Sequence, residues 1–259
     1  MAEMDPITIY ARSGDGASNS HREAVARRVL KHFEAASPAT LDARAICYLD
    51  YEDATWLRCE FGRANRGIHW PIRGKGLICW PQYMWDKVSD ISITGEVSWP
   101  YDCIIYLHGS TCETDIGLTL TLAHELQHFV QYAISRPLWA VHTLLSNLPG
   151  LPKDNLQGWK DFPLEKEARV VAKRIAEKLF GADPVSDYIK GMIDAHLTDG
   201  DAIDWAFIQG INCSLSYDAT EETKHLVRLY KRELSELQKT LSSPRDADIS
   251  GVNLDDWEN

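Results

Sequence analysis

The sequence His124-Glu125-Leu126-Gln127-His128 lies inside a long apolar stretch that begins at Gly117 and ends near Ile134. Apolar side chains recur there with the period of an α-helix, and no proline or glycine interrupts residues 118–136. We therefore expect a helix over about 117–134.

The HExxH pattern in this helix is typical of a metal site. A spacing of four places the His124 and His128 imidazoles one turn apart on one face, where both can reach a single Zn²⁺ at about 2.0 to 2.1 Å. Glu125 is displaced around the helix from His124, so it suits the role of general base better than that of ligand. The alternative is an ordinary amphipathic helix that binds no metal.

A catalytic zinc site needs a third protein ligand, and residues 162–172 offer two carboxylates, Glu165 and Glu167. On a helical projection Glu165 shares its face with small and apolar residues such as Ala168, whereas Glu167 points toward cationic side chains. Glu165 is therefore the expected third ligand, and Glu167 is the rival. Without a metal, Glu165 would be a carboxylate favoured by the N-terminal end of its helix.

The segments His124–Gln131 and Pro163–Ala168 resemble the HExxHxxQ and PxExEA signatures of gluzincin-type zinc metallopeptidases, including the minimal gluzincins. They are also similar to the ImmA/IrrE metalloproteases. The resemblance covers about 60 residues. It implies a zincin-like fold, zinc bound by His124, His128 and Glu165, and Glu125 as the catalytic base.

The chain departs from these families in two ways. The 36 residues between His128 and Glu165 form a longer insertion than compact members carry, and whether residues 137–162 act as a lid is left open. Arg169 stands where the ImmA/IrrE pattern has asparagine. Sequence also does not choose an oxyanion-stabilising residue among Tyr132, His142, Arg169 and several other tyrosines.

The chain order of apolar patterns predicts an α+β, zincin-like fold, in which a small N-terminal mixed sheet precedes a helical part carrying the HExxH helix. We expect one domain over residues 1–241, mainly sheet and loops with one helix in 1–110 and mainly helical in 111–241. Residues 242–259 are expected to form a flexible tail. The expected strands lie near 7–10, 45–49, 55–61, 77–80 and 103–107, and the expected helices near 20–36, 117–134, 137–146, 163–180, 184–197 and 220–241.

These features predict a cytoplasmic zinc-dependent metallopeptidase that hydrolyses a peptide bond in a protein or peptide substrate. The net charge of −11 disfavours nucleic acid and anionic lipid as partners, and no stretch is long and apolar enough for a membrane helix. The alternative is a non-catalytic or regulatory zinc protein, whose metal ties helices together and whose acidic surface binds a protein partner. The sequence leaves the oligomeric state open.

Overall fold

The structure is a computed structural model of the 259-residue chain, and it describes residues 7–11, 16–36, 45–51, 67–71, 103–148, 162–196, 201–241 and 249–257. The strands are β1 (Ile7–Ala11), β2 (Ala45–Tyr51), β3 (Gly67–Pro71) and β4 (Cys103–His108). The α-helices are α1 (Gly16–Ala36), α4 (Asp115–Ile134), α5 (Arg136–Ser146), α7 (Pro163–Phe180), α8 (Ala182–Ala195), α9 (Asp201–Gly210) and α10 (Ala219–Thr240). Two short 3₁₀ turns, η1 (Gly109–Cys112) and η3 (Leu254–Trp257), complete the described elements.

The strands form one sheet in the order β1-β2-β4-β3. β1 pairs parallel to β2 with Ile9 opposite Cys47, and β2 pairs parallel to β4 with Cys47 opposite Ile105. β3 pairs antiparallel to β4 and forms one edge of the described sheet. Because α1 connects the parallel strands β1 and β2, the chain begins with a β-α-β unit.

The predicted fold class, an α+β zincin-like fold with the sheet preceding the helices, is wrong. A mixed sheet is present, but its strands hold only five to seven residues each, and the described residues are mostly helical. The helix expected between the first two strands is present as α1, so the correction concerns the small share of strand in the described residues. Apolar runs indicate individual strands, whereas the pairing of strands depends on contacts between segments far apart in the chain.

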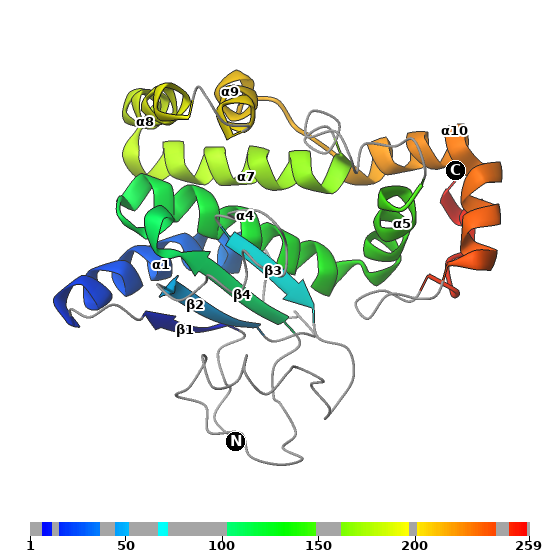
Figure 1. Cartoon of the computed structure of the whole chain (residues 1–259), viewed down its shortest axis with the longest axis horizontal. Coiled ribbons are helices and arrows are strands. Elements are labelled where there is room, and N and C mark those ends of the chain that lie inside the picture. The colour runs from blue at the N-terminus through cyan, green and yellow to red at the C-terminus, as the bar shows by residue number, and fades with distance from the viewer. Residues whose placement is uncertain are drawn as a thin grey trace, which may run out of the picture.

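Helix α4 occupies the centre of the molecule (Figure 1). The sheet and α1 lie on one side of it, and α7 runs along the other. Helices α8 and α9 pack outside α7, while α5 and α10 pack together beyond the C-terminal end of α4. This arrangement buries α4 on both sides and places α7 directly against it.

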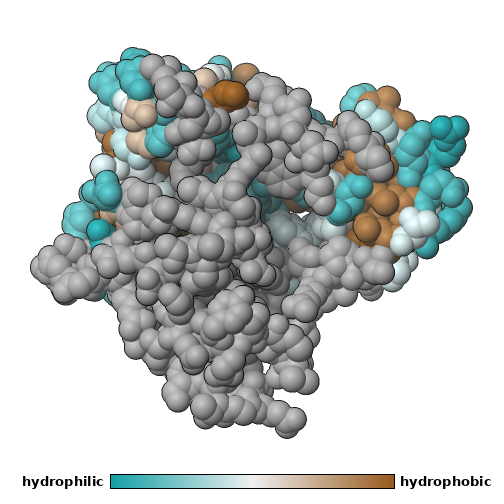
Figure 2. Space-filling view, viewed as in Figure 1, coloured by the Kyte–Doolittle hydropathy of each residue, from teal (hydrophilic) through white to brown (hydrophobic). Residues whose placement is uncertain are grey.

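Among the described residues, three groups of buried side chains stabilise these layers. The first joins the sheet, α1 and α4, and it includes Val29, Leu49, Ile105, Leu122 and Phe129. The second joins α5, α10 and the C-terminal segment, and the third lies between α4, α7, α8 and α9. In Figure 2 hydrophilic side chains cover the outer side of α10, whereas hydrophobic ones gather where it faces α5.

The observed helices α4, α5, α7, α8 and α10 begin and end within a few residues of the bounds predicted for them. Helix α9 and strand β3 were not predicted, and the strands expected at 55–61 and 77–80 lie outside the described residues. The expected flexible tail contains packed residues, because Ile249, Leu254 and Trp257 are buried in the core shared with α10. No helix in the described part of the chain combines the length and the apolar character needed to cross a bilayer.

Candidate metal centre

Helix α4 presents the two histidines of the motif. Its N-cap residue is Thr114, whose Oγ1 accepts a hydrogen bond from the Gly117 backbone N–H at 3.0 Å, and Asp115 follows in the first turn. One turn separates His124 from His128, and their ring centroids lie 4.6 Å apart. The two Nε2 atoms point toward each other at 3.1 Å, so both can face one ion.

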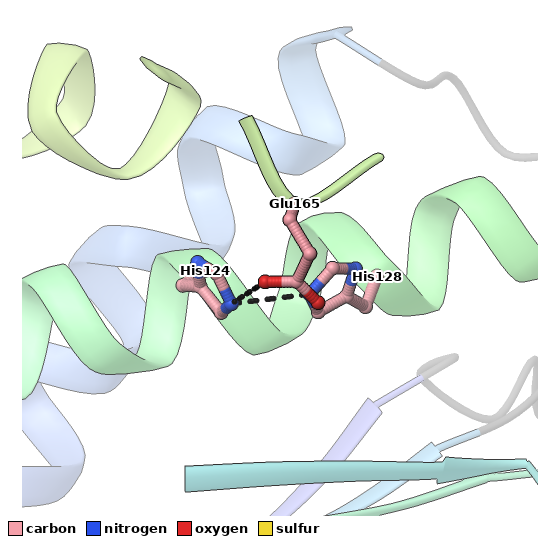
Figure 3. Close-up of side chains that lie close together, drawn as sticks. All are labelled: His124, His128 and Glu165. Carbon is pink, nitrogen blue, oxygen red and sulfur yellow. Dashed lines mark hydrogen bonds and ion pairs between the residues drawn. The ribbon is translucent and has the colours of Figure 1, made fainter. Parts of the chain in front are cut away.

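Helix α7 brings Glu165 to these nitrogens. It begins with Pro163, which is well suited to a first helical turn, and Ala168 is fully buried where α7 approaches α4. Glu165 Oε1 lies 3.2 Å from His128 Nε2, and Glu165 Oε2 lies 3.5 Å from His124 Nε2 (Figure 3). The three side chains therefore converge from two helices on one point.

The convergence has the dimensions of a tetrahedral metal site. One candidate ligand atom from each residue lies within 4.8 Å of the others. Bonds of about 2.0 to 2.1 Å to zinc place neighbouring ligand atoms of a tetrahedron about 3.3 to 3.4 Å apart. The separation of 3.1 Å between the two Nε2 atoms and that of 3.2 Å between His128 Nε2 and Glu165 Oε1 lie close to that edge, and the second carboxylate oxygen, Oε2, lies 3.5 Å from His124 Nε2. The group can therefore bind a metal ion with small adjustments.

The electrostatics of the group favour a cation. Burial lowers the pKa of His124 to about 4, so this imidazole is neutral and has a lone pair for a metal. Burial acts in the same direction on His128, but the neighbouring Glu165 carboxylate outweighs it and raises the pKa of His128 to about 9. Although burial alone would raise the pKa of Glu165, His128 and the other nearby donors hold it well below its ordinary value. A metal ion would take the place of the His128 proton beside this carboxylate.

A hydrogen-bond network orients His128 from behind. His128 Nδ1 lies 2.8 Å from Gln131 Oε1, and since an amide oxygen accepts, Nδ1 donates and Nε2 faces the centre. Gln131 Nε2 donates to Glu167 Oε2 at 2.8 Å and to the Leu164 carbonyl at 3.1 Å. Gln127 Nε2 donates to the same Glu167 oxygen at 3.0 Å. Glu167, the rival ligand, thus binds two amides, and Glu165 is the carboxylate that joins the histidines.

Comparison with known proteins adds no relative. The chain matches no protein-family model, no curated protein and no solved structure. The resemblance to gluzincin-type metallopeptidases therefore depends on the short HExxHxxQ and PxExEA segments alone.

Glu125, the predicted general base, lies beside the ligand group without joining it. Its side chain is buried, and its charge contributes to the raised pKa of His128. Burial raises the pKa of the Cys47 thiol on β2, and the charges of Cys112 and then Glu125 add smaller contributions in the same direction. Glu125 is therefore close enough to act electrostatically on both the centre and the sheet beneath it.

The oxyanion candidates differ in their surroundings. Tyr132 is buried, and the guanidinium carbon of Arg136 lies 3.6 Å from the centre of its ring. Burial lowers the pKa of His142 to about 4, and its ring centroid lies 4.8 Å from that of Phe162. Arg169 donates to Glu165 and to a second carboxylate, so its guanidinium is already engaged.

Helix α5, from the long insertion, forms a fixed wall of the site. Val141, Leu144 and Leu145 are fully buried in the core that α5 shares with α10. The Trp139 ring packs edge-on against His128, with 6.2 Å between the ring centroids. Residues 149–161 of the insertion, which was considered as a lid, lie outside the described residues.

The sequence analysis assigned no role to Asp204, which pairs with Arg169 from α9. Asp204 lies 35 residues from its partner, in a helix that was itself not predicted. In the sequence, Asp204 is marked by its place within a short apolar stretch, where an acidic side chain needs a partner if it is buried.

Proposed function

We propose that this protein is a zinc-dependent metallopeptidase. The observation that carries the proposal is the convergence of His124, His128 and Glu165 beside the buried carboxylate of Glu125. Two imidazoles and one carboxylate are a ligand set that zinc uses in hydrolytic enzymes, and an adjacent acid or base is the further group that hydrolysis needs.

In the proposed reaction the two histidines and Glu165 hold the ion, and Glu125 transfers protons. Bound zinc supplies polarisation of the scissile carbonyl and lowers the pKa of a water molecule toward about 7. Glu125 accepts a proton from the attacking water and then donates it to the leaving amine. The burial of Glu125 limits the exchange of that proton with bulk solvent.

The position of β3 supports a peptide as the substrate. This strand lies at one edge of the described sheet, antiparallel to β4, and it contacts the metal-site helix α4. An extended peptide can add to such an edge through main-chain hydrogen bonds. A substrate bound in this way would run alongside the helix that carries Glu125.

The alternative is a non-catalytic zinc protein, in which the ion ties α4 to α7 and the acidic surface recruits a protein partner. A structural zinc site is closed by a fourth protein ligand, whereas a catalytic site keeps one position for water or substrate. The group found within the described ranges contains three potential ligand residues.

The substitution Glu125→Gln tests the proposal. Zinc content and cleavage of a random peptide library, followed by mass spectrometry, should be compared for the wild type, Glu125→Gln and the exposed control Glu113→Gln. We expect both variants to retain zinc, and Glu125→Gln to lose cleavage by about 10²-fold or more. Equal cleavage by the wild type and Glu125→Gln refutes the mechanism, and a fourth protein ligand in a zinc-bound crystal structure establishes the alternative.

A further inference from the structure

A buried cation touches the carboxylate of the metal centre. Arg169 Nη1 donates to Glu165 Oε2 at 2.8 Å and to the Glu165 backbone carbonyl at 3.1 Å. On its other side, Arg169 Nε donates to Asp204 Oδ1 at 3.0 Å. The side chains of Arg169, Glu165 and Asp204 are 9%, 10% and 12% exposed, so the chain of charges is shielded from water.

This arrangement needs an explanation because a positive charge beside a metal ligand opposes the binding of a second cation. Asp204 compensates for that charge, since it forms a buried ion pair with the guanidinium. The Asp204–Arg169 pair can therefore contact Glu165 without adding net charge to the site. The remaining effect of Arg169 is to make the two oxygens of the Glu165 carboxylate unequal.

The two oxygens of Glu165 have different neighbours. Arg169 donates to Oε2 of Glu165, which also lies 3.5 Å from His124 Nε2, whereas the described neighbour of Oε1 is His128 Nε2 at 3.2 Å. A metal bound to His128 Nε2 ends the hydrogen bond from that nitrogen to Oε1, whereas Arg169 still donates to Oε2. The oxygen that still accepts a charge-assisted hydrogen bond is the weaker ligand.

We propose that Arg169, anchored by Asp204 of α9, is a positioning residue that holds Glu165 Oε2 and leaves Oε1 as the single oxygen for the metal. The inference rests on the metal centre of the proposed function. Binding through one oxygen leaves a coordination position for water or substrate, which a carboxylate bound through both oxygens would fill.

A second contact keeps α9 in the position that this role needs. Lys173, one turn after Arg169 on α7, donates through Nζ to the Gln209 carbonyl at 2.9 Å and to the Ile211 carbonyl at 2.8 Å. Two cations on one face of α7 thus bind the middle and the end of α9. Helix α9 thereby becomes part of the support of the metal centre, although it supplies no ligand.

The test is a double substitution, Arg169→Gln with Asp204→Asn, which removes one positive and one negative charge and so keeps the net charge. The control is Arg174→Gln on the same helix, because Arg174 is exposed and donates to the Cys213 and Leu215 carbonyls. Two properties should be measured for the full chain: the Kd for Zn²⁺ and Co²⁺ by competition with a chromophoric chelator, and the visible absorption of the Co²⁺ form. The Co²⁺ absorption reports coordination number independently of turnover.

We expect the double variant to bind both ions about 10- to 100-fold more weakly, because Glu165 is no longer held in place. We also expect lower Co²⁺ absorption, because Glu165 Oε2 becomes free to bind as an additional ligand. The control should match the wild type in both measurements. A folded double variant with the wild-type Kd and spectrum overturns the proposal. Should the double variant not fold, the Co²⁺ spectrum of Asp204→Asn decides, because the proposal requires lower absorption for it and a wild-type spectrum overturns the proposal.

A different result separates this inference from the proposed function. If the wild type binds no Co²⁺, or if His124→Ala binds it as tightly as the wild type, the metal centre itself is refuted and the role of Arg169 falls with it. If His124→Ala abolishes binding while the double variant behaves as wild type, only the role of Arg169 is refuted.

Discussion

The substitution Gln131→Met removes the amide behind His128 while nearly preserving side-chain volume. Gln131 is 4% exposed, and its Oε1 accepts from His128 Nδ1 at 2.8 Å. Its Nε2 donates to the Glu167 carboxylate and to the Leu164 carbonyl. The thioether of methionine can replace none of these contacts.

The magnitude follows from these contacts. A buried polar group that loses its partner costs about 1 to 3 kcal/mol, and His128 Nδ1 loses its amide acceptor in this variant. Substitution of a residue that orients a ligating histidine typically weakens metal binding about 10- to 100-fold, or about 1.4 to 2.7 kcal/mol. We therefore expect metal-free Gln131→Met to be less stable than the wild type by about 1 to 3 kcal/mol, and its Kd for Zn²⁺ to rise about 10- to 100-fold.

The matched control is Gln127→Met. Gln127 lies one turn earlier on α4, and its side-chain amide donates to the same Glu167 oxygen at 3.0 Å. Urea unfolding of the metal-free proteins gives the stability difference, and competition with a chelator gives the Kd. If Gln131→Met binds Zn²⁺ as tightly as Gln127→Met, the amide does not orient His128 and the reasoning is wrong.

Three further predictions concern the scaffold. Gly117→Ala should destabilise the protein by about 1 to 3 kcal/mol in urea unfolding, because a Cβ there would lie 2.5 Å from Tyr188 Oη, whereas Gly191→Ala, with open space around it, should be neutral or slightly stabilising. Burial raises the pKa of Cys112 to about 11, so the thiol loses its proton at lower pH in the unfolded chain than in the folded one. The free energy of unfolding should therefore fall by about 2 to 3 kcal/mol as pH rises from about 9 to 11, and Cys112→Ala should lack this pH-dependent loss of stability. Trp257→Ala should cost about 3 to 5 kcal/mol in the same assay if the C-terminal segment is part of the core, and no effect would show that its packing is unimportant.

Local patterns predicted the helices well, because apolar spacing and breaker residues are properties of contiguous sequence. Pro163 marks the start of α7, and the glycine-free run after Gly117 corresponds to α4. The fold class could not be obtained in this way. Parallel pairing of β1 with β2 around α1 joins residues about 40 positions apart, and no local period encodes it.

The candidate site shows the same division. The spacing of four predicts that His124 and His128 share a face, and helical angles indicate Glu165 rather than Glu167 as the third ligand. The structure brings the two histidines and Glu165 together. The supporting contacts were beyond reach. Asp204 meets Arg169 only through the packing of α9 on α7, which depends on the tertiary fold.

The most direct test of the account is the zinc content of the protein purified under zinc-replete conditions, measured beside Glu165→Gln and Glu167→Gln. The account predicts about one zinc per chain in the wild type and in Glu167→Gln, with loss of zinc in Glu165→Gln. A wild type without zinc, or full zinc in Glu165→Gln together with loss in Glu167→Gln, would contradict it.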